Sequence, residues 1–303
     1  MIDYHRELLA DETRTRAYRD AIRATVQPGD VVLDLGCGSG ILSFFALEAG
    51  AARVYAIDRG HMADVAQFLS RHLGVAGQMT VLHETSTGVE LPERADVLVT
   101  ETMGVLIFDE NMLSFVLDAR RRLLRENAAM VPQRVALAIV PAEVPVAYGK
   151  RVGFWSEPRY GLDLTPLRVF ASNSIAFIHL DPSSYVAAPQ IVVDVDLRTF
   201  DSALVNGRCA FTAGRDGLVH GFGVWFETTL AEGIGFSTRE PKSTHWAQAL
   251  LPLETPLRVE RGAAIEVDLE TDDGRIWRWR GHAAGTLFDQ TTIFAAPPCV
   301  RRD

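Results

Sequence analysis

The sequence predicts a doubly wound α/β domain in the first half of the chain and an all-β domain in the second half. Up to about residue 132, short apolar runs alternate with amphipathic segments, which is typical of parallel strands connected by helices. After Pro132, β-rich runs follow one another with turn residues between them. We therefore expect one domain over residues 1–132 and a second over residues 133–303.

The elements of the first domain follow from the spacing of apolar residues. Residues near 5–25 have a mixed 3.6-residue rhythm that indicates a helix, and Pro28 and Gly29 end it. In the last predicted helix, Asp109 is placed to cap the start, and arginines 120–122 lie near the end, where the helix dipole favours cations. The predicted strands are 31–35, 54–57, 79–82 and 97–100, and the predicted helices are 41–49, 62–72 and about 110–125.

The second domain is predicted from short β-rich runs. A polar stretch at residues 271–274 indicates a hairpin turn between the last two of these runs. Residues near 150–185 show little strand pattern, and we expect them to form an excursion that is large enough to contact a partner. The predicted strands are 135–140, 191–197, 218–226, 264–269 and 276–280.

Composition and charge exclude several classes of protein. The net charge of −9 and the isoelectric point near 5.4 argue against a general nucleic-acid binder, which needs a basic surface. Cys37, Cys209 and Cys299 are far apart and outside any Cys/His cluster, so neither a disulfide framework nor a metal site is expected. The start of the chain is charged, and no run approaches the roughly 20 apolar residues of a membrane span. We expect a cytoplasmic protein without a membrane or nucleic-acid partner.

A glycine-rich loop follows the first predicted strand. Gly36, Gly38 and Gly40 allow a sharp turn and a close approach of a ligand to the backbone. Asp58 ends the next strand, where a carboxylate can bind two ribose hydroxyls. The G-x-G-x-G spacing differs from the G-x-G-x-x-G of dinucleotide enzymes, and Asp34 would repel a pyrophosphate but could bind an amino group or support the loop. S-adenosylmethionine is therefore favoured over NAD; the alternatives are a dinucleotide enzyme and a loop that only packs.

Two glutamates lie at the ends of the loop that follows the fourth predicted strand. Glu101 falls at the strand end and Glu110 at the start of the next helix, so a hairpin-like loop would bring both carboxylates to one pocket. In an open α/β sheet, this edge is where ligands bind. Arginine stays protonated, and its planar fork of donors matches carboxylates bidentately. The pair therefore suits a guanidinium substrate, and two merely solvated glutamates are the alternative.

With these residues, the chain resembles the protein arginine N-methyltransferases over nearly its whole length. Residues 9–15 look like the family's helix before the cofactor fold, residues 32–43 are similar to its cofactor loop, and residues 101–112 resemble its double-glutamate loop. Residues 244–246 are identical to its threonine-histidine-tryptophan loop. The resemblance implies a Rossmann-like domain that binds S-adenosylmethionine, a β-barrel substrate domain, and a dimerisation arm at about residues 150–185 that forms a homodimer.

The resemblance also implies roles for individual residues. Arg14 would bind the carboxylate of the cofactor, and Glu101 and Glu110 would hold the guanidinium. His245 would pair with Asp11, or would only tie the two domains together. The expected catalytic residues are Glu101, Glu110 and His245. The expected cofactor-binding residues are Arg14, Asp34, Gly36, Gly38, Gly40, Asp58, Ser86 and Thr87, and the expected substrate-binding residues are Met103, Met112 and Trp246.

The chain departs from the family pattern at several positions. Thr102 and Val105 stand where the family usually has a tryptophan and a tyrosine, so the pocket is expected to lack aromatic walls there. No carboxylate occurs at residues 86–88, near the family's acidic residue on the adenine side. The family's tyrosine-bearing helix would lie before Met1, and His5 sits where that motif ends. We therefore expect the lid to be missing or to be supplied by another segment.

The predicted function is the transfer of a methyl group from S-adenosylmethionine to a guanidinium nitrogen of arginine. The substrate would be an arginine-containing protein or peptide. One alternative is methylation of free L-arginine or of another guanidine- or amine-bearing small molecule or peptide in bacterial metabolism, and another is a catalytically silent dimeric scaffold. The intact glutamates and cofactor loop disfavour the scaffold, and the glycine spacing disfavours an oxidoreductase.

Overall fold

The computed structural model describes residues 2–239 and 244–292, and the chain divides into two compact units. This division differs from the predicted single boundary at residues 132 and 133, because two later segments return to the first unit. The 15-residue strand β10 (Gly217–Ala231) is one of the elements that begin in one unit and end in the other. The first unit comprises Met1–Ala136, Asp194–Ala203 and Phe226–Trp246, and the second comprises Leu137–Val193, Leu204–Trp225 and Ala247–Asp303.

The first unit is built on a five-stranded parallel sheet with the order β3-β2-β1-β4-β5, which confirms the doubly wound α/β fold. Five successive residues of β1 are buried, as expected for a sheet that is covered on both faces. Strand β5 is absent from the predicted elements, because its exposed polar residues Arg125, Glu126 and Asn127 hide the strand pattern. The strands are β1 Val31–Leu35, β2 Arg53–Asp58, β3 Met79–His83, β4 Ala95–Thr100 and β5 Leu124–Val131.

Helices connect these strands, and the right-handed crossover rule places α3 and α4 on one face of the sheet and α5 on the other. The single helix predicted at the start of the chain is two helices, since Asp11 caps α2 by accepting a hydrogen bond from the Arg14 backbone N–H (3.0 Å). The predicted cap of α5 is wrong. That helix begins after Asn111, and the Asp109 carboxylate accepts from the backbone N–H of Leu106 instead (2.8 Å). The helices are α1 Ile2–Ala10, α2 Glu12–Thr25, α3 Ile41–Glu48, α4 Met62–His72 and α5 Met112–Arg122.

The second unit is built from β-sheets, which confirms the all-β prediction. One sheet has the order β7-β12-β10-β6-β8, and the other has the order β15-β14-β13-β9. The predicted hairpin turn joins β13 to β14, and Asp273 and Gly274 have the positive φ values, 49° and 73°, that a tight two-residue turn requires. The strands are β6 Arg134–Ala142, β7 Ala176–Ile178, β8 Gln190–Asp196, β9 Leu204–Thr212, β12 Gln248–Val259, β13 Ala264–Asp272, β14 Trp277–Ala283 and β15 Thr286–Thr291; β11 Ile234–Ser237 pairs with the end of β10 in the first unit.

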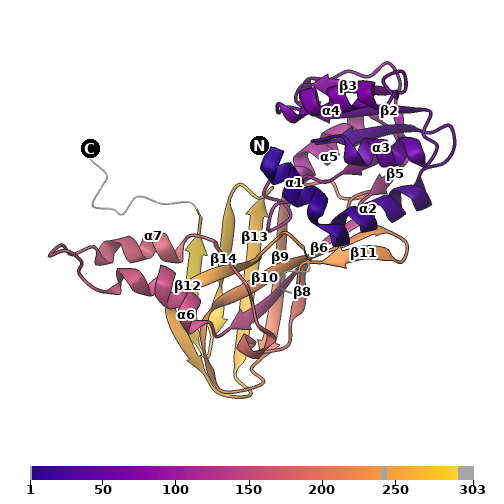
Figure 1. The fold of residues 1–303 in the computed structure, drawn as a ribbon. Coiled ribbons are helices and arrows are strands. Elements are labelled where there is room, and N and C mark those ends of the chain that lie inside the picture. The colour runs from indigo at the N-terminus through magenta and orange to yellow at the C-terminus, as the bar shows by residue number, and fades with distance from the viewer. Residues whose placement is uncertain (1, 240–243, 293–303) are drawn as a thin grey trace, which may run out of the picture. The chain divides into compact units, whose positions relative to one another are not determined.

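Two short helices, α6 (Pro145–Arg151) and α7 (Arg168–Ser172), lie side by side and project from the strands of the second unit (Figure 1). The predicted excursion at about residues 150–185 therefore contains short helical segments, together with the three-residue strand β7. Tyr160, between these helices, is 98% exposed. In the part of the chain that the structure describes, no helix combines the length and the apolar character that crossing a membrane requires. The 3-10 turns are η1 Ser86–Gly88, η2 Gly153–Ser156, η3 Thr165–Leu167 and η4 Pro182–Ser184.

Candidate active site

The strand order of the first unit reverses between β1 and β4, and in an open α/β sheet ligands bind at that point, beyond the carboxyl ends of the strands. A cavity of about 430 Å³ lies there. This volume is within the range of roughly 300–1,000 Å³ that is usual for small-molecule sites. The loops after β1, β2, β3 and β4 and one edge of α1 line the cavity. Its lining includes Tyr4, His5, Arg14, Gly36, Gly38, Asp58, Arg59, Glu84, Ser86, Glu101, Met103, Glu110 and Phe115.

Two glycines of the loop after β1 present their backbone to the cavity. Gly36 has a φ of +78° and Gly38 a φ of +53°, which are conformations that favour glycine. A Cβ at Gly38 would lie 2.7 Å from Cε1 of His5, and one at Gly36 would collide with Cγ2 of Thr102. Both positions therefore need glycine for conformation and for space, and the backbone remains open to a closely bound ligand.

Two residues of the expected cofactor set, Asp34 and Gly40, lie behind this loop instead of lining the cavity. Asp34 is fully buried and accepts a hydrogen bond from Oγ of Ser43 (2.6 Å), and burial raises its pKa to about 7. A Cβ at Gly40 would lie 3.0 Å from Cε of Met79, so the absence of a side chain serves packing. Both residues support the loop, and the expectation that they contact the cofactor directly stays a prediction.

Carboxylates follow β2 and β3 at one edge of the cavity. Asp58 accepts hydrogen bonds from the backbone N–H groups of Gly38 (2.8 Å) and Gly60 (2.7 Å), which fix the orientation of its carboxylate. Glu84 also lines the cavity, on the side where no carboxylate was expected. Its position follows from the register of the sheet, because Asp58 pairs with His83 and Glu84 is the next residue.

The remaining expected contacts divide between the cavity and the structure around it. Ser86 and Met103 line the cavity. Thr87 is exposed and lies outside the lining, although it follows Ser86 directly. Met112 is fully buried as the first residue of α5, and it packs in the core beneath the loop. The expected contacts of Thr87 with the cofactor and of Met112 with the substrate stay predictions.

Glu101 and Glu110 line the same cavity from the two ends of the loop after β4. The loop between them is tightly folded: Ile107 has a positive φ of 60°, a conformation that a branched residue seldom adopts. A Cβ at Gly104 would lie 2.5 Å from Cβ of Asp109, so only glycine permits this close approach. The predicted hairpin-like loop thus brings both carboxylates to one pocket.

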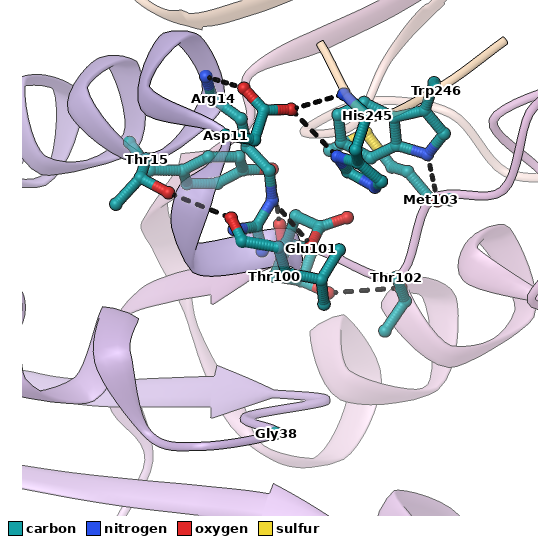
Figure 2. A network of polar contacts seen from close by, with 12 residues as sticks. Asp11, Arg14, Thr15, Gly38, Thr100, Glu101, Thr102, Met103, His245 and Trp246 are labelled. Atoms are coloured by element: carbon teal, nitrogen blue, oxygen red, sulfur yellow. Dashed lines mark hydrogen bonds and ion pairs between the residues drawn. The ribbon is translucent and has the colours of Figure 1, made fainter. Parts of the chain in front are cut away.

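The two carboxylates have different surroundings. One oxygen of Glu101 accepts hydrogen bonds from Nε (2.9 Å) and Nη2 of Arg14, and both side chains are largely buried, at 8% and 5% exposure (Figure 2). Glu110 is exposed to the cavity. Desolvation, followed by the negative charge of Glu101, raises the pKa of Glu110. The cavity therefore holds one carboxylate that is neutralised by an arginine and one that is open to a cation.

Asp11 joins the start of α2 to residues 244–246 (Figure 2). Its Oδ1 accepts from the Arg14 backbone, and its Oδ2 accepts from the backbone N–H of His245 (2.8 Å) and lies 2.8 Å from Nδ1 of that residue. Burial opposes ionisation of Asp11, but the hydrogen bonds from His245 and Arg14 outweigh it and lower the pKa. The expected pairing of His245 with Asp11 is present, and His245 itself lies outside the cavity lining.

Trp246 supports the glutamate loop from behind. Its indole Nε1 donates to the carbonyl of Met103 (3.0 Å) (Figure 2). Its ring stacks on Phe236 at a centroid distance of 5.7 Å. The ring is only 5% exposed and is not part of the lining. Packing against Phe236 and the bond to Met103 fix the ring next to the glutamate loop, and the expected role of Trp246 as a wall of the substrate pocket stays a prediction.

One edge of α1 covers part of the cavity. Tyr4, His5, Leu8 and Leu9 line it, so a segment of this chain stands where the lid was expected to be missing or replaced. The carbonyl of Leu8 also accepts from Nη1 of Arg14 (3.2 Å), which ties the helix to the site. Sequence reasoning missed Tyr4 as a site residue, although its position next to His5 was a signal. It also missed Arg59, Glu84 and Phe115.

The chemistry of the lining fits the expected S-adenosylmethionine. Arg14 has five N–H donors, and Glu101 and Leu8 use three of them, so donors remain for a carboxylate. Asp58 is placed to accept from ribose hydroxyls, and the glycine loop permits close approach of the rest of the molecule. Over residues 2–239 and 244–292, no group of three or more histidine, cysteine, aspartate and glutamate side chains could hold a metal ion.

Family models match both parts of the chain. The model described as the arginine methyltransferase oligomerization subdomain matches residues 134–281. A model described as ribosomal protein L11 methyltransferase matches residues 13–117.

Individual relatives match nearly the whole chain. Protein arginine N-methyltransferase 2 of Xenopus tropicalis is 32% identical over 90% of this chain and 67% of the relative. Protein arginine N-methyltransferase 6 of Xenopus laevis is 32% identical over 88% of this chain and 83% of the relative. Among solved structures, the Trypanosoma brucei PRMT1 enzyme–prozyme heterotetrameric complex with AdoHcy superimposes with a TM-score of 0.86 at 27% identity, covering 95% of this chain and 96% of the other.

Proposed function

Because this chain belongs to the protein arginine N-methyltransferase family and is an S-adenosylmethionine-dependent arginine N-methyltransferase, we propose that the cavity of its first unit binds both reactants. The methyl group passes to a guanidinium nitrogen of an arginine in a protein substrate. One observation carries this proposal: Glu101 and Glu110 line a single cavity together with Arg14 and the glycine loop.

The first part of the proposal assigns the residues that hold S-adenosylmethionine, which supplies an electrophilic methyl group on a sulfonium. Arg14 binds the carboxylate with the donors that Glu101 leaves free. Gly36 and Gly38 let the methionine chain approach the backbone, and Asp58 accepts from the ribose hydroxyls. Ser86 lies at the same edge and contacts the base side.

The second part concerns the substrate. A guanidinium nitrogen is a weak nucleophile because its lone pair is delocalised, and two carboxylates that draw the positive charge to the other nitrogens leave the attacking one richer in electrons. Charge-assisted, bidentate hydrogen bonds also fix the plane of the guanidinium. Holding the nitrogen in line with the methyl group contributes the positioning effect, which is worth up to roughly 7–11 kcal/mol in well-oriented reactions.

His245 acts by positioning in this proposal. It lies outside the cavity lining, and Asp11 connects its loop to the backbone of Arg14. Because Arg14 in turn fixes Glu101, the His245–Asp11 pair holds the arginine that both reactants need. The alternative, a histidine that only ties the two domains together, stays a prediction, since Asp11 and His245 both belong to the first unit.

The comparisons do not favour the other functions that the sequence leaves open. The matching relatives carry the name protein arginine N-methyltransferase. This supports a protein substrate over free L-arginine or another small molecule, and an enzyme over a silent scaffold or an oxidoreductase.

The direct test uses the whole chain and a labelled methyl donor. The protein is incubated with methyl-labelled S-adenosylmethionine and arginine-rich peptides, and in parallel with free arginine. We expect label in the peptide, located on arginine by mass spectrometry. Label in free arginine alone would contradict the protein substrate, and failure to bind S-adenosylhomocysteine in calorimetry would contradict the cofactor site.

We further infer that the protein is a cytoplasmic homodimer in which residues 1–132 form the S-adenosylmethionine-binding domain and residues 133–303 the substrate domain with the arm at 150–185. The match of residues 134–281 to an oligomerization subdomain supports this, as do the exposed Tyr160 and Leu162 on the arm. Light scattering of a chain without residues 150–185 tests it, and we expect monomers with reduced activity. A deletion variant that stays dimeric would exclude the arm as the interface.

A further inference from the structure

Tyr4, on α1, belongs to the same cavity as the two glutamates. It lines the cavity together with Glu101 and Glu110. The neighbouring ring of His5 packs edge-on against Tyr4 at a centroid distance of 5.8 Å, and His5 itself lies against the loop at Gly38. Tyr4 is therefore held at the cavity by a side chain that is anchored to the glycine loop.

The charges of both glutamates reach the phenol of Tyr4. Burial is the largest cause that raises its pKa, and the carboxylates of Glu101 and Glu110 are the next two. The phenol consequently stays protonated at neutral pH. An O–H donor thus shares the cavity with two carboxylate acceptors.

Only one of those two carboxylates is already fixed. Glu101 is bound by Arg14. Among the residues that the structure describes, no cation forms an ion pair with Glu110. A hydrogen bond from a phenol to a carboxylate is charge-assisted and stronger than one between neutral groups. Tyr4 has the chemistry to fix Glu110 as Arg14 fixes Glu101.

Aromatic rings are scarce around the expected guanidinium position. Thr102 and Val105 have none, and Trp246 packs behind the loop. Of the lining side chains that the structure describes, those with rings are Tyr4, His5 and Phe115. Tyr4 is 53% exposed, so part of its surface is accessible to a ligand. A cation over such a face is attracted by the ring electrons.

We propose that Tyr4 is a substrate-binding residue whose hydroxyl donates to Glu110 and whose ring covers the guanidinium when the substrate is bound. This assignment rests on the proposed function of the cavity. It replaces, with a residue of α1, the aromatic wall that positions 102 and 105 do not provide.

Two variants separate the hydroxyl from the ring. Tyr4→Phe keeps the ring, and we expect kcat to fall about tenfold with a smaller change in the KM for the peptide, because Glu110 loses its hydrogen bond. Tyr4→Leu also removes the ring, and we expect the KM to rise roughly tenfold in addition. The affinity for S-adenosylhomocysteine should stay within about twofold in both variants. Wild-type kcat and KM in both would overturn the proposal, and so would a loss confined to S-adenosylhomocysteine affinity.

A matched control and a binding measurement complete the test. Ile2→Ala changes an exposed residue of the same helix that is outside the cavity lining, and it should behave like the wild type. Calorimetry with an arginine-containing peptide and bound S-adenosylhomocysteine measures guanidinium binding without turnover. If the wild type binds the peptide and Tyr4→Leu binds it more weakly, the assignment of Tyr4 stands even when no methyl is transferred, and only the proposed reaction fails. A wild type that binds no peptide would overturn the assignment.

Discussion

The two ends of the loop after β4 carry the same functional group in contrasting settings. At the strand end, Glu101 is largely buried and bound by two nitrogens of Arg14. At the helix end, Glu110 is exposed to the cavity and carries a raised pKa because of desolvation and the charge of Glu101. One carboxylate is therefore fixed before any ligand arrives, whereas the other is free to respond to one.

This difference bears on how a cationic substrate is held. A preorganised charge stabilises a reaction without rearranging when the charge moves, and its contribution is largest in a site that excludes water. Glu101 meets that description, and Arg14 links it to the expected cofactor. The charged form of Glu110 is instead stabilised most when a cation enters, because the cation offsets the repulsion between Glu110 and Glu101. We expect substitutions at the two ends to differ in size and in kind.

The largest effect is expected for Glu101→Gln. The neutral amide cannot draw charge from the guanidinium, and Arg14 is left as a buried charge without its anion. We expect kcat to fall by roughly 10³-fold, with binding of S-adenosylhomocysteine retained because Arg14 stays available to its carboxylate. Kinetics and calorimetry on the same preparation measure both. Unchanged turnover would remove Glu101 from the mechanism.

A smaller effect is expected for Glu110→Gln. The amide still accepts a hydrogen bond from the substrate, and Glu101 keeps its partner, so kcat should fall by roughly 10²-fold. Glu90→Gln is the matched control, since Glu90 is exposed and outside the cavity lining. A fall in kcat for Glu110→Gln that equals or exceeds the fall for Glu101→Gln would contradict the expected difference between the two glutamates.

The pH profile distinguishes the two ends in the unmodified protein. Glu110 must be a carboxylate to hold a cation, and its pKa lies above the ordinary value for glutamate. As the pH falls, Glu110 therefore takes up its proton earlier than an ordinary glutamate, and kcat/KM, which reports the free enzyme, should decline from that pH downward. Glu110→Gln should lack this acidic limb. If the acidic limb persists in the Glu110→Gln variant, the titration of another group causes it.

The smallest effect is expected for Trp246→Phe, which tests the support of the loop. The ring is kept and the hydrogen bond to the Met103 carbonyl is lost, which should lower the free energy of unfolding by about 1–3 kcal/mol. We expect kcat to change only a few-fold, because the indole lies outside the cavity. Thermal unfolding and steady-state kinetics measure the two quantities. A kcat loss comparable to that of Glu110→Gln would indicate instead that Trp246 contacts the substrate.

Much of the fold is predictable from sequence, and the exceptions have physical causes. Strand β1 and helix α4 have the predicted bounds, because a run that is apolar except for Asp34 marks the strand and a clear helical period marks the helix. Strand β9 is absent from the predicted strands, because the dipeptide Asn206-Gly207 is typical of a turn. In the structure a Cβ at Gly207 would collide with the carbonyl of Val192, so this glycine permits a close approach of backbones and not a turn.

The sequence predicts which loops form the site, but it does not predict on which side of a loop each side chain lies. The sequence motifs predict that Trp246 and Met112 lie near the glutamates, and both do. A motif does not show which side of the loop a residue occupies, and these two residues pack behind the loop. Glu84 and Tyr4 line the cavity from elements whose neighbours were recognised, so their positions follow only when the register of β3 and the path of α1 are known.

The hydrogen bonds of Asp11 have a consequence for the order in which parts of the protein fold during synthesis. Asp11 meets His245 across 234 positions of the chain, so the support of Arg14 is completed only after most of the polypeptide has left the ribosome. The parallel sheet can form from the first 136 residues, but the threonine-histidine-tryptophan loop arrives much later. During synthesis, a folded sheet should therefore exist for some time without a completed site.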